Sequence, residues 1–344
     1  MKSKTRVIRE IHKIKKLLDR NRKNITIITH VNPDGDAIGS CLALGRILSV
    51  AGHQTGIITP NMYPDFLKWM PGNDQVIVFT NAQKKARELV EKADVIFCVD
   101  FNDLSRVKQI NELLEKSAAL KVLIDHHPTE NYFADVVYCD INTSSTAELI
   151  FDFVQELGYE KDIDTEFATC IFAGIMTDTG CFSFNSSIPH TYRVVAKLLE
   201  CGIDKDMAYY NIYDNFSVDR MRLLGYALNT KMEIFQEFHT AVITLSREEQ
   251  KKYNFQPGDS EGFVNYPLSI KGIKFSAFFI EKEDHVKMSF RSKGSFAVNK
   301  FAELHFKGGG HLNASGGEYS GTMESALNMF RAFLAQYHKE LTDE

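Results

Sequence analysis

The sequence predicts an α/β protein: a doubly wound parallel sheet in an N-terminal domain, a connecting helix, and a smaller mixed α+β C-terminal domain. In the N-terminal half, short runs of β-branched residues without polar alternation are separated by helical segments, which indicates strands buried on both faces of a parallel sheet. Near the C-terminus, strand-like runs follow one another before the last helices. The 344 residues also exceed the roughly 250 to 300 residues that one hydrophobic core usually spans, so two domains are expected.

The N-terminal elements follow from the spacing of apolar residues. Helical spacing over residues 6–18 predicts an amphipathic first helix. A buried strand is expected at 25–30 and a helix at 36–52, with Gly52 as its stop signal. Further strands are expected at TGIIT, QVIVF, DVIFCVD and ALKVLID, and further helices at AQKKARELVEKA and LSRVKQINELLEKS. Strands that alternate with helices in this way build a doubly wound sheet.

The pattern becomes helical from about residue 145 to 230. We expect a catalytic domain at 1–212, a helical linker at 213–235 and a substrate-binding domain at 236–344. The last domain is predicted to contain strands at 238–245 and 273–292, then a helix, a glycine cluster and a final amphipathic helix from about residue 323.

Composition limits the function. With 40 Lys and Arg against 45 Asp and Glu, the net charge is −5, and 44% of the residues are hydrophobic, which is typical of a folded globular protein. A protein that clamps long duplex nucleic acid needs a dense basic surface, so that class is excluded, whereas a small anionic substrate is not. The six cysteines lack CxxC spacing, and no segment approaches 18 apolar residues. We expect a cytoplasmic protein with free thiols and no membrane partner.

Acidic and histidine residues stand at the ends of several predicted strands, where doubly wound sheets bind their ligands. Each residue alone has a structural explanation as a helix cap, a turn residue or a buried histidine. Together they favour a bound cation, because carboxylates packed within a few ångströms repel one another. The set comprises His30, Asp34, Asp36, Asp100, Asp125, His126 and His127, with Asp178 added from a helical segment.

The donor types select the metal. Carboxylate and imidazole without thiolate suit Mn²⁺, Mg²⁺, Co²⁺ or Fe²⁺. Five or more such groups are too many for one octahedral ion with open positions. Two ions about 3.5 to 4 Å apart that share one carboxylate fit better, and this arrangement cleaves phosphoesters.

The motifs around these residues resemble those of the DHH phosphoesterases. In family order they are THVNPDGDAIGS (29–40), VDFND (99–103), IDHHP (124–128) and MTDTG (176–180). A further motif, FKGGGHLNASGG (306–317), resembles the glycine-rich substrate loop of the DHH-associated C-terminal domain. Within this RecJ-like superfamily, the two-domain layout is similar to the group of oligoribonucleases, or nanoRNases, that are also phosphoadenosine-phosphate phosphatases.

The resemblance implies a role for each matched residue. One Mn²⁺ would be held by His30 and Asp34, the second by Asp36, His126 and Asp178, and Asp100 would bridge the two ions. Asp125 would orient a ligating histidine, as such carboxylates commonly do. His127 would face the substrate phosphate and donate a proton to the leaving oxygen.

The glycine cluster and one arginine are the phosphate candidates of the second domain. Gly308, Gly309 and Gly310 let the backbone approach an anion, and His311 adds a donor, although a bare glycine run is more often a flexible turn. Arg291 is a second candidate because guanidinium binds phosphate oxygens bidentately.

We therefore predict an Mn²⁺-dependent enzyme that hydrolyses short RNA to mononucleotides and removes the 3′-phosphate of phosphoadenosine phosphate, with Mg²⁺ or Co²⁺ as substitute metals. The same motifs also serve linear-dinucleotide (pApA-type) phosphodiesterases, single-strand exonucleases, polyphosphatases and pyrophosphatases. A processive exonuclease should carry a basic channel, which the net charge argues against. A non-catalytic nucleotide sensor should lack a metal ligand, and none is missing. The sequence leaves a homodimer open.

Overall fold

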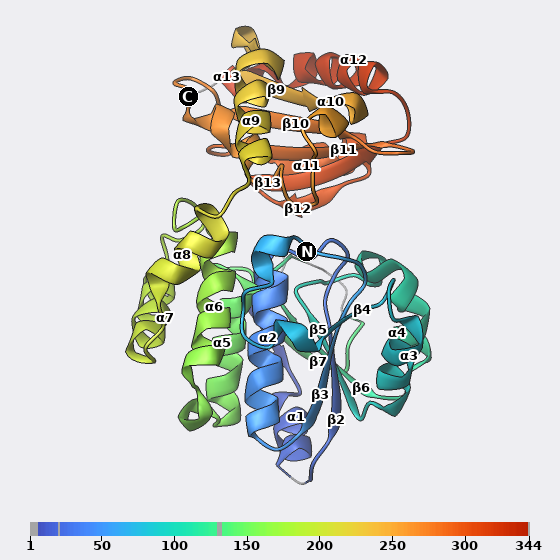
Figure 1. Ribbon diagram of the computed structural model, residues 1–344, viewed down its shortest axis with the longest axis vertical. Coiled ribbons are helices and arrows are strands. Elements are labelled where there is room, and N and C mark those ends of the chain that lie inside the picture. Colours follow the sequence, from blue (N-terminus) through green and yellow to red (C-terminus); the bar gives the residue numbers. More distant parts are fainter. Residues whose placement is uncertain (1–5, 20, 129–132, 343–344) are drawn as a thin grey trace. The chain divides into compact units, whose positions relative to one another are not determined.

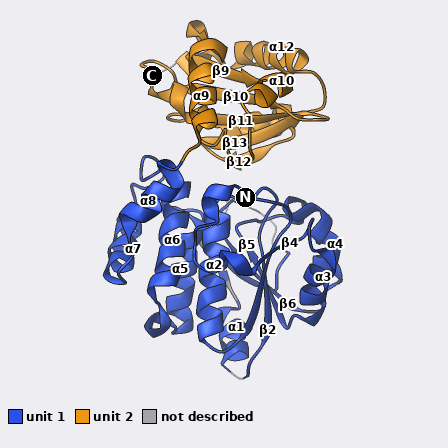
Figure 2. Cartoon of the chain, viewed as in Figure 1, with its two compact units in different colours: residues 1–215 blue, residues 216–344 orange. Residues whose placement is uncertain are grey.

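The computed structural model describes residues 6–19, 21–128 and 133–342 (Figure 1). The chain forms two compact units, Met1–Asn215 and Phe216–Glu344 (Figure 2). Each unit encloses its own hydrophobic clusters.

The first unit is built on a seven-stranded sheet with the order β1-β7-β6-β5-β2-β3-β4. Its strands are β1 (Arg6–Arg9), β2 (Asn24–Ile28), β3 (Gln54–Thr59), β4 (Val76–Val78), β5 (Val95–Val99), β6 (Leu120–Asp125) and β7 (Val136–Asp140). All neighbours are parallel except β1, which pairs antiparallel with β7. The strand order reverses between β2 and β5, so the carboxyl ends of these two strands flank the topological switch point, where such sheets bind ligands.

Helices cover both faces of this sheet (Figure 1). One face carries α3 (Gln83–Lys92) and α4 (Asn111–Lys116). The other carries α1 (Ile11–Leu18), α2 (Gly35–Val50), α5 (Thr146–Leu157) and α6 (Thr165–Asp178), and α7 (Pro189–Glu200) and α8 (Lys205–Tyr213) pack outside them. Ile27 belongs to one core cluster and Ile28 to the other, which shows that β2 is buried on both faces. This double burial explains the missing polar alternation.

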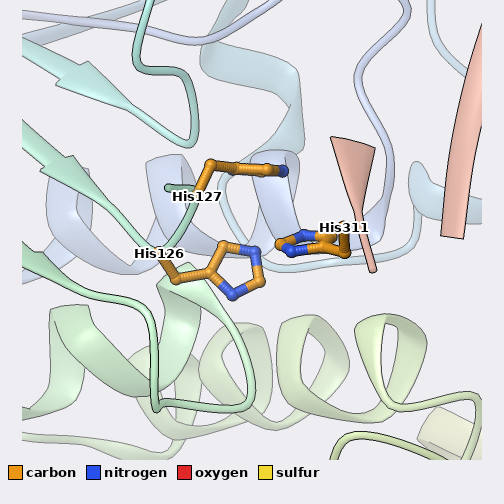
Figure 3. A group of neighbouring side chains, drawn as sticks. All are labelled: His126, His127 and His311. Carbon is orange, nitrogen blue, oxygen red and sulfur yellow. The ribbon is translucent and has the colours of Figure 1, made fainter. Parts of the chain in front are cut away.

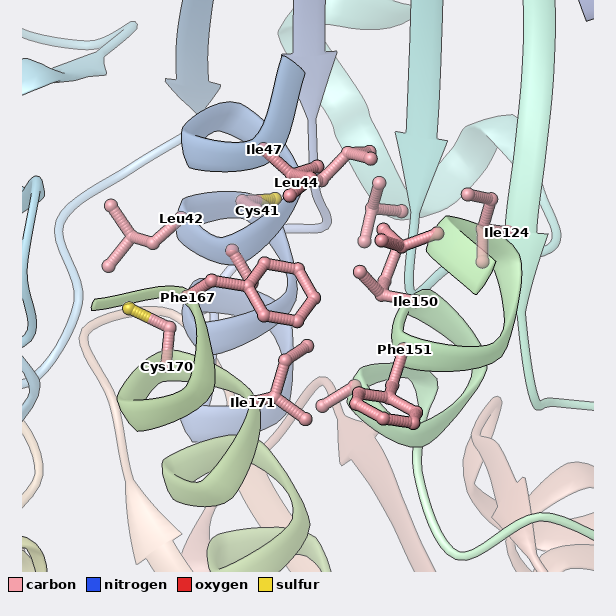
Figure 4. Packing of buried hydrophobic residues seen from close by; sticks show 14 of the residues in the cluster. Cys41, Leu42, Leu44, Ile47, Ile124, Ile150, Phe151, Phe167, Cys170 and Ile171 are labelled. Atoms are coloured by element: carbon pink, nitrogen blue, oxygen red, sulfur yellow. The ribbon is translucent and has the colours of Figure 1, made fainter. Parts of the chain in front are cut away.

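The packing of α2, α5 and α6 brings the functional segments of the first unit close together. Figure 4 shows Leu44 of α2, Ile150 of α5 and Phe167 of α6 in one apolar cluster. Helices α5 and α6 approach closely at Gly174, where an added Cβ would lie 2.6 Å from the Cβ of Ala147. A side chain at Gly174 would therefore push the start of α5 away.

The second unit contains a six-stranded mixed sheet with the order β12-β13-β11-β10-β9-β8. Its strands are β8 (Met232–Phe235), β9 (Thr240–Leu245), β10 (Phe275–Glu281), β11 (Val286–Ser292), β12 (Gly309–His311) and β13 (Ala314–Tyr319). Only β9 and β10 pair in parallel. A phenylalanine-rich core joins one face to α11 (Val298–Phe306), α12 (Met323–Leu334) and α13 (His338–Thr342). Helix α9 (Val218–Tyr226) packs on the other face, and α10 (Arg247–Lys252) follows β9.

Three parts of the first unit differ from the prediction. Residues 6–18 were expected to form one helix, but they form β1 and then α1, because pairing with β7 outweighs the helical spacing at residues 6–9. The helix expected at LSRVKQINELLEKS is a 3₁₀ segment (Leu104–Ile110) followed by α4, with a break at Lys108, whose φ is 42° and ψ is −106°. Strand β7 was not predicted.

Beyond Tyr213, the helical linker predicted at 213–235 is helical only over residues 218–231. Helix α8 ends at Tyr213, and α9 is followed by one π-helical turn (Ala227–Lys231) and then by β8. Because β8 pairs antiparallel with β9, both α9 and β8 belong to the second unit.

The cysteines are free thiols, as expected, and Cys41, Cys98, Cys139 and Cys170 are buried. Among the helices in the described ranges, none combines the length and the apolar character needed to cross a membrane.

Candidate metal centre and phosphate-binding surface

Neighbouring strands bring His30 and Asp100 together at the switch point. His30 follows β2 and Asp100 follows β5, and the two side chains are buried. Nε2 of His30 lies 3.2 Å from Oδ2 of Asp100. Asp100 has a φ of 65°, a left-handed conformation that costs a non-glycine residue about 1 to 3 kcal/mol. Strain of this kind is typical of functional sites.

The orientation of His30 suits a metal ligand. Its Nδ1 lies 2.9 Å from the carbonyl oxygen of Val31, which can only accept, so Nδ1 carries the proton. Nε2, the other ring nitrogen, faces the Asp100 carboxylate and is the atom that a cation shared with this carboxylate would bind. Ligating histidines typically donate their other N–H in this way.

Asp34 and Asp36 lie at the start of α2 and have different partners. Asp34 is exposed and caps the helix, its Oδ1 accepting from the Ala37 N–H at 3.0 Å. Asp36 is buried and is not the cap. Its oxygens accept from the backbone N–H groups of Thr146 at 2.7 Å and Ala147 at 2.8 Å, at the start of α5. A helix-capping role therefore accounts in part for the aspartate at position 34, but it does not account for the aspartate at position 36.

His126 lies among three carboxylates. It follows β6, together with His127 (Figure 3), and it is buried. Its Nε2 lies 3.8 Å from Oδ2 of Asp36, 3.8 Å from Oδ1 of Asp100 and 3.6 Å from Oδ2 of Asp178, the last residue of α6. These separations are too long for hydrogen bonds. They match the roughly 3 to 4 Å between two donors that share an ion at about 2.1 Å.

The described residues contain donor groups of the right composition for divalent metals. The ligand atoms of His30, Asp34 and Asp100 lie within 4.8 Å of one another, as do those of Asp36, His126 and Asp178, and those of Asp100, Asp125 and His127. The structure thus brings together every side chain that the sequence predicted to bind metal.

The electrostatics of this centre also favour a cation. Burial, followed by the charges of Asp100, Asp178 and Asp34, raises the pKa of Asp36 well above its usual range. Burial lowers the pKa of His126, which keeps its imidazole neutral and able to coordinate. Burial would raise the pKa of Asp100 as well, but the imidazoles of His30 and His127 outweigh it and lower that pKa. A buried, ionised carboxylate beside others needs positive charge, which a divalent metal supplies.

His127 is held by Asp125. Its Nδ1 lies 2.8 Å from Oδ1 of Asp125, which is fully buried, and the His126 and His127 rings are nearly perpendicular. Burial disfavours the charged imidazole, but the Asp125 and Asp100 carboxylates outweigh it and raise the pKa of His127 to about 9. His127 is therefore a cation at neutral pH in the metal-free protein.

In the second unit, Arg291, His311 and Gly309 lie on one face of the sheet. Arg291 of β11 pairs with Ala314 of β13, which pairs with His311 of β12. Directly paired residues point to the same side, so the guanidinium and the imidazole flank a small residue. The next row on that face is Ser289, Gly316 and Gly309. Over β11–β13 this face carries Arg291, His311 and small residues, whereas over β9 and β10 the same face is apolar and packs against α9.

The glycine cluster differs from the expected loop. Gly309 and Gly310 belong to strand β12, and Gly308 precedes it. An added Cβ at Gly308 would lie 1.9 Å from the carbonyl oxygen of Gly316, whereas Gly309 has open space. Close packing against β13 therefore explains why residue 308 is a glycine. No atom near Gly309 blocks the approach of a ligand to its backbone.

One residue of the first unit was missed. Thr146 contacts both Asp36 and Asp100 through hydrogen bonds at 2.7 Å. The S-x-x-E pattern of Ser145 and Glu148 indicates a helix start at this place, but no sequence signal shows that this start faces Asp36.

Comparison with known proteins gives matches along most of the chain. Residues 24–175 match the model of the DHH family, N-terminal domain, and residues 236–340 match the DHHA1 domain. A Thermus thermophilus protein named bifunctional oligoribonuclease and PAP phosphatase NrnA is 30% identical over 301 residues, which cover 86% of this chain and 84% of that protein.

Solved structures share the fold. The crystal structure of an exopolyphosphatase-related protein from Bacteroides fragilis aligns with a TM-score of 0.92 and 43% identity, covering 98% of this chain and 99% of that one. RecJ from Thermus thermophilus, crystallised with Mn²⁺, aligns with a TM-score of 0.58 and 14% identity, covering 98% of this chain and 55% of RecJ. The predicted fold class is confirmed.

Proposed function

This chain belongs to the DHH family, and we propose that it is an Mn²⁺-dependent phosphoesterase that hydrolyses short RNA oligonucleotides to mononucleotides and removes the 3′-phosphate of phosphoadenosine phosphate. The observation that carries the proposal is the buried cluster of carboxylates and imidazoles around Asp100. The name of the Thermus thermophilus relative supports the substrate class.

The donor groups are consistent with two bound ions. His30 and Asp34 would hold one ion, Asp36, His126 and Asp178 would hold the other, and Asp100 would be shared by both. Mn²⁺ suits these ligands, with Mg²⁺ or Co²⁺ as substitutes. Bound divalent ions lower the pKa of water and offset the charge that develops on the phosphoryl group.

The protein's own groups bind the substrate and move the proton. With Nδ1 held by Asp125, the protonated His127 donates from Nε2 to the leaving oxygen. In the second unit, Arg291, His311 and the backbone of Gly308, Gly309 and Gly310 bind substrate phosphates. The reaction needs no broad basic surface, which agrees with the net charge of −5. We place the enzyme in the cytoplasm because its thiols are free.

Polyphosphate is a second candidate substrate. The relative from Bacteroides fragilis is described as exopolyphosphatase-related, and it is 43% identical to this chain. The chemistry that divalent ions would supply here suits a phosphoanhydride as well as a phosphoester, so the proposed ligands do not distinguish the two substrates.

A rate comparison with Mn²⁺ tests the proposal. The substrates are a ribodinucleotide, longer RNA, single-stranded DNA oligomers, phosphoadenosine phosphate, pApA, pyrophosphate and polyphosphate. We expect the ribodinucleotide and phosphoadenosine phosphate to react fastest, and Asp100→Asn to lower both rates more than about 100-fold. Asp103→Asn, an exposed N-cap on the same segment, is the matched control. Full activity of Asp100→Asn would reject the centre, and a preference for polyphosphate would favour the second candidate.

A further inference from the structure

We propose that the N-terminus of α5 positions both halves of the metal centre and that Thr146 is the positioning residue that joins them. The inference rests on the proposed metal ligands, and it adds a residue that touches neither ion nor substrate.

Thr146 contacts a ligand of each half. Its hydroxyl donates to Oδ1 of Asp100 at 2.7 Å, and its backbone N–H donates to Oδ2 of Asp36 at 2.7 Å. The other oxygen of Asp100 faces Nε2 of His30 at 3.2 Å. Both oxygens of Asp100 therefore have a fixed neighbour, which sets the rotation of the carboxylate that is proposed to bridge the ions.

The helix end also supports Asp36. The first N–H groups of a helix have no partner within the helix and lie at its positive end. Two of those in α5, from Thr146 and Ala147, are taken by the two oxygens of Asp36. Ser145 completes the cap by accepting from the Glu148 N–H at 3.1 Å. The start of α5 thus favours the ionised form of a buried ligand and fixes its plane.

A buried glutamate holds this helix end in place. Oε2 of Glu148 accepts from the backbone N–H of Ser144 at 3.2 Å, from the Ser144 hydroxyl, and from the Thr191 hydroxyl of α7 at 2.8 Å. Glu148 and Thr191 are both buried. Three donors thus converge on one oxygen of Glu148. The contacts therefore run from α7 through Glu148 and the start of α5 to Asp36 and Asp100.

The acceptor of the Thr146 hydroxyl distinguishes a positioning role from the hydrogen bonding that is usual within helices. Buried threonines in helices commonly donate to a backbone carbonyl one turn earlier. Thr169 of α6 does so, with its hydroxyl 2.7 Å from the carbonyl oxygen of Thr165. The hydroxyl of Thr146 instead donates to a carboxylate of another segment. Thr169→Val is consequently a matched control for the loss of one buried hydroxyl.

The test uses the full chain and Mn²⁺ alone as the probe, with free Mn²⁺ measured by electron paramagnetic resonance. Thr146→Val keeps the volume and the backbone N–H but removes the hydroxyl. We expect it to weaken Mn²⁺ binding about 10- to 100-fold, the usual cost of losing a partner of a metal ligand. Thr146→Ser should restore affinity close to that of the wild type, and Thr169→Val should leave it unchanged.

Thermal melting curves of the same variants in EDTA measure the stability of the metal-free protein. Wild-type Mn²⁺ affinity in Thr146→Val, with or without a lower melting temperature, would overturn the inference and leave only a structural role. If the wild type itself bound no Mn²⁺, the proposed function would fail as well, so the two failures are distinguishable. If circular dichroism shows Thr146→Val to be unfolded, Thr146→Ala provides the same test.

Discussion

One carboxylate at the metal centre, that of Asp36, lowers the stability of the metal-free protein. Burial and the neighbouring charges place the folded-state pKa of Asp36 above its unfolded value. A group shifted in this direction contributes stability below the unfolded pKa, and that contribution is lost as the pH rises through the folded pKa. At neutral pH, Asp36 therefore costs stability until a cation binds. This proposed metal ligand thus trades stability for function, as active-site residues often do.

Asp178→Asn tests this cost because it removes one of the charges that repel Asp36. We expect the metal-free variant to be more stable by about 1 kcal/mol, the order of one pKa unit, which raises the melting temperature by about 2 to 4 °C. Added Mn²⁺ should stabilise the variant much less than the wild type. The measurement is thermal melting in EDTA and in Mn²⁺, with the exposed Asp74→Asn as the control. An equal Mn²⁺ effect in wild type and Asp178→Asn would exclude Asp178 as a ligand.

The protonation of His127 should make the stability of the metal-free protein depend on pH. Because Asp125 raises its pKa to about 9 against the effect of burial, the imidazole should be charged up to about pH 9 in the metal-free protein. Its contribution to stability is present below the unfolded pKa of about 6.5 and is lost as the pH rises through about 9. An NMR titration of the histidine rings in EDTA measures this value. In Asp125→Asn the His127 pKa should fall, and an unchanged value would show that Asp125 does not hold the proton on His127.

At the scale of elements, the strands that build the metal centre were the most predictable. β2, β5 and β6 are buried on both faces, so their apolar runs and acidic ends were visible in the sequence. β1 and β8 were mistaken for helix because their strand state depends on pairing with distant partners, β7 and β9. A local pattern of apolar residues does not contain that information.

The functional residues also divide into those visible in a local sequence pattern and those that depend on packing between distant segments. His30, Asp36, Asp100 and His126 could be predicted because they stand at strand ends or in motifs. Thr146 could not, because its role follows from the packing of α5 beside α2. The β12–β13 hairpin was expected to be a loop, since a run of three glycines has no side-chain pattern that distinguishes a strand from a turn.

The two glycines at the start of the hairpin provide a matched pair of variants. In Gly308→Ala the new Cβ would lie 1.9 Å from the carbonyl oxygen of Gly316, so the hairpin must shift. We expect lower stability, by about 1 to 3 kcal/mol, and a higher KM for a dinucleotide. In Gly309→Ala the methyl group meets open space, so the melting temperature should not change. If Gly309 approaches a phosphate, KM should nevertheless rise, and an unchanged KM would remove Gly309 from the phosphate site.

At the scale of the whole molecule, the net charge of the chain favours a short substrate. The net charge of −5 includes carboxylates that two divalent ions would offset, and the phosphate candidates of the second unit centre on Arg291 and His311. Under the proposed function, metals and a few donors would hold the substrate, which would gain nothing from phosphates beyond them. We therefore expect the chain to differ from proteins that track long single strands through a basic groove lined with aromatic residues.

The small number of phosphate contacts predicts how hydrolysis depends on RNA length and on salt concentration. Each phosphate neutralised by a cationic side chain on single-stranded nucleic acid contributes about −0.7 to the slope of log affinity against log salt. With about two such contacts, log kcat/KM should fall with a slope of about −1 to −2, and the slope should be the same for RNA of three and of ten nucleotides. KM should likewise not decrease with length. Steady-state kinetics from 50 to 300 mM salt at fixed Mn²⁺ measures both quantities. A slope that steepens with each added nucleotide would reveal a binding track along the RNA backbone, and the enzyme would then belong with the processive exonucleases rather than with those that hydrolyse short fragments.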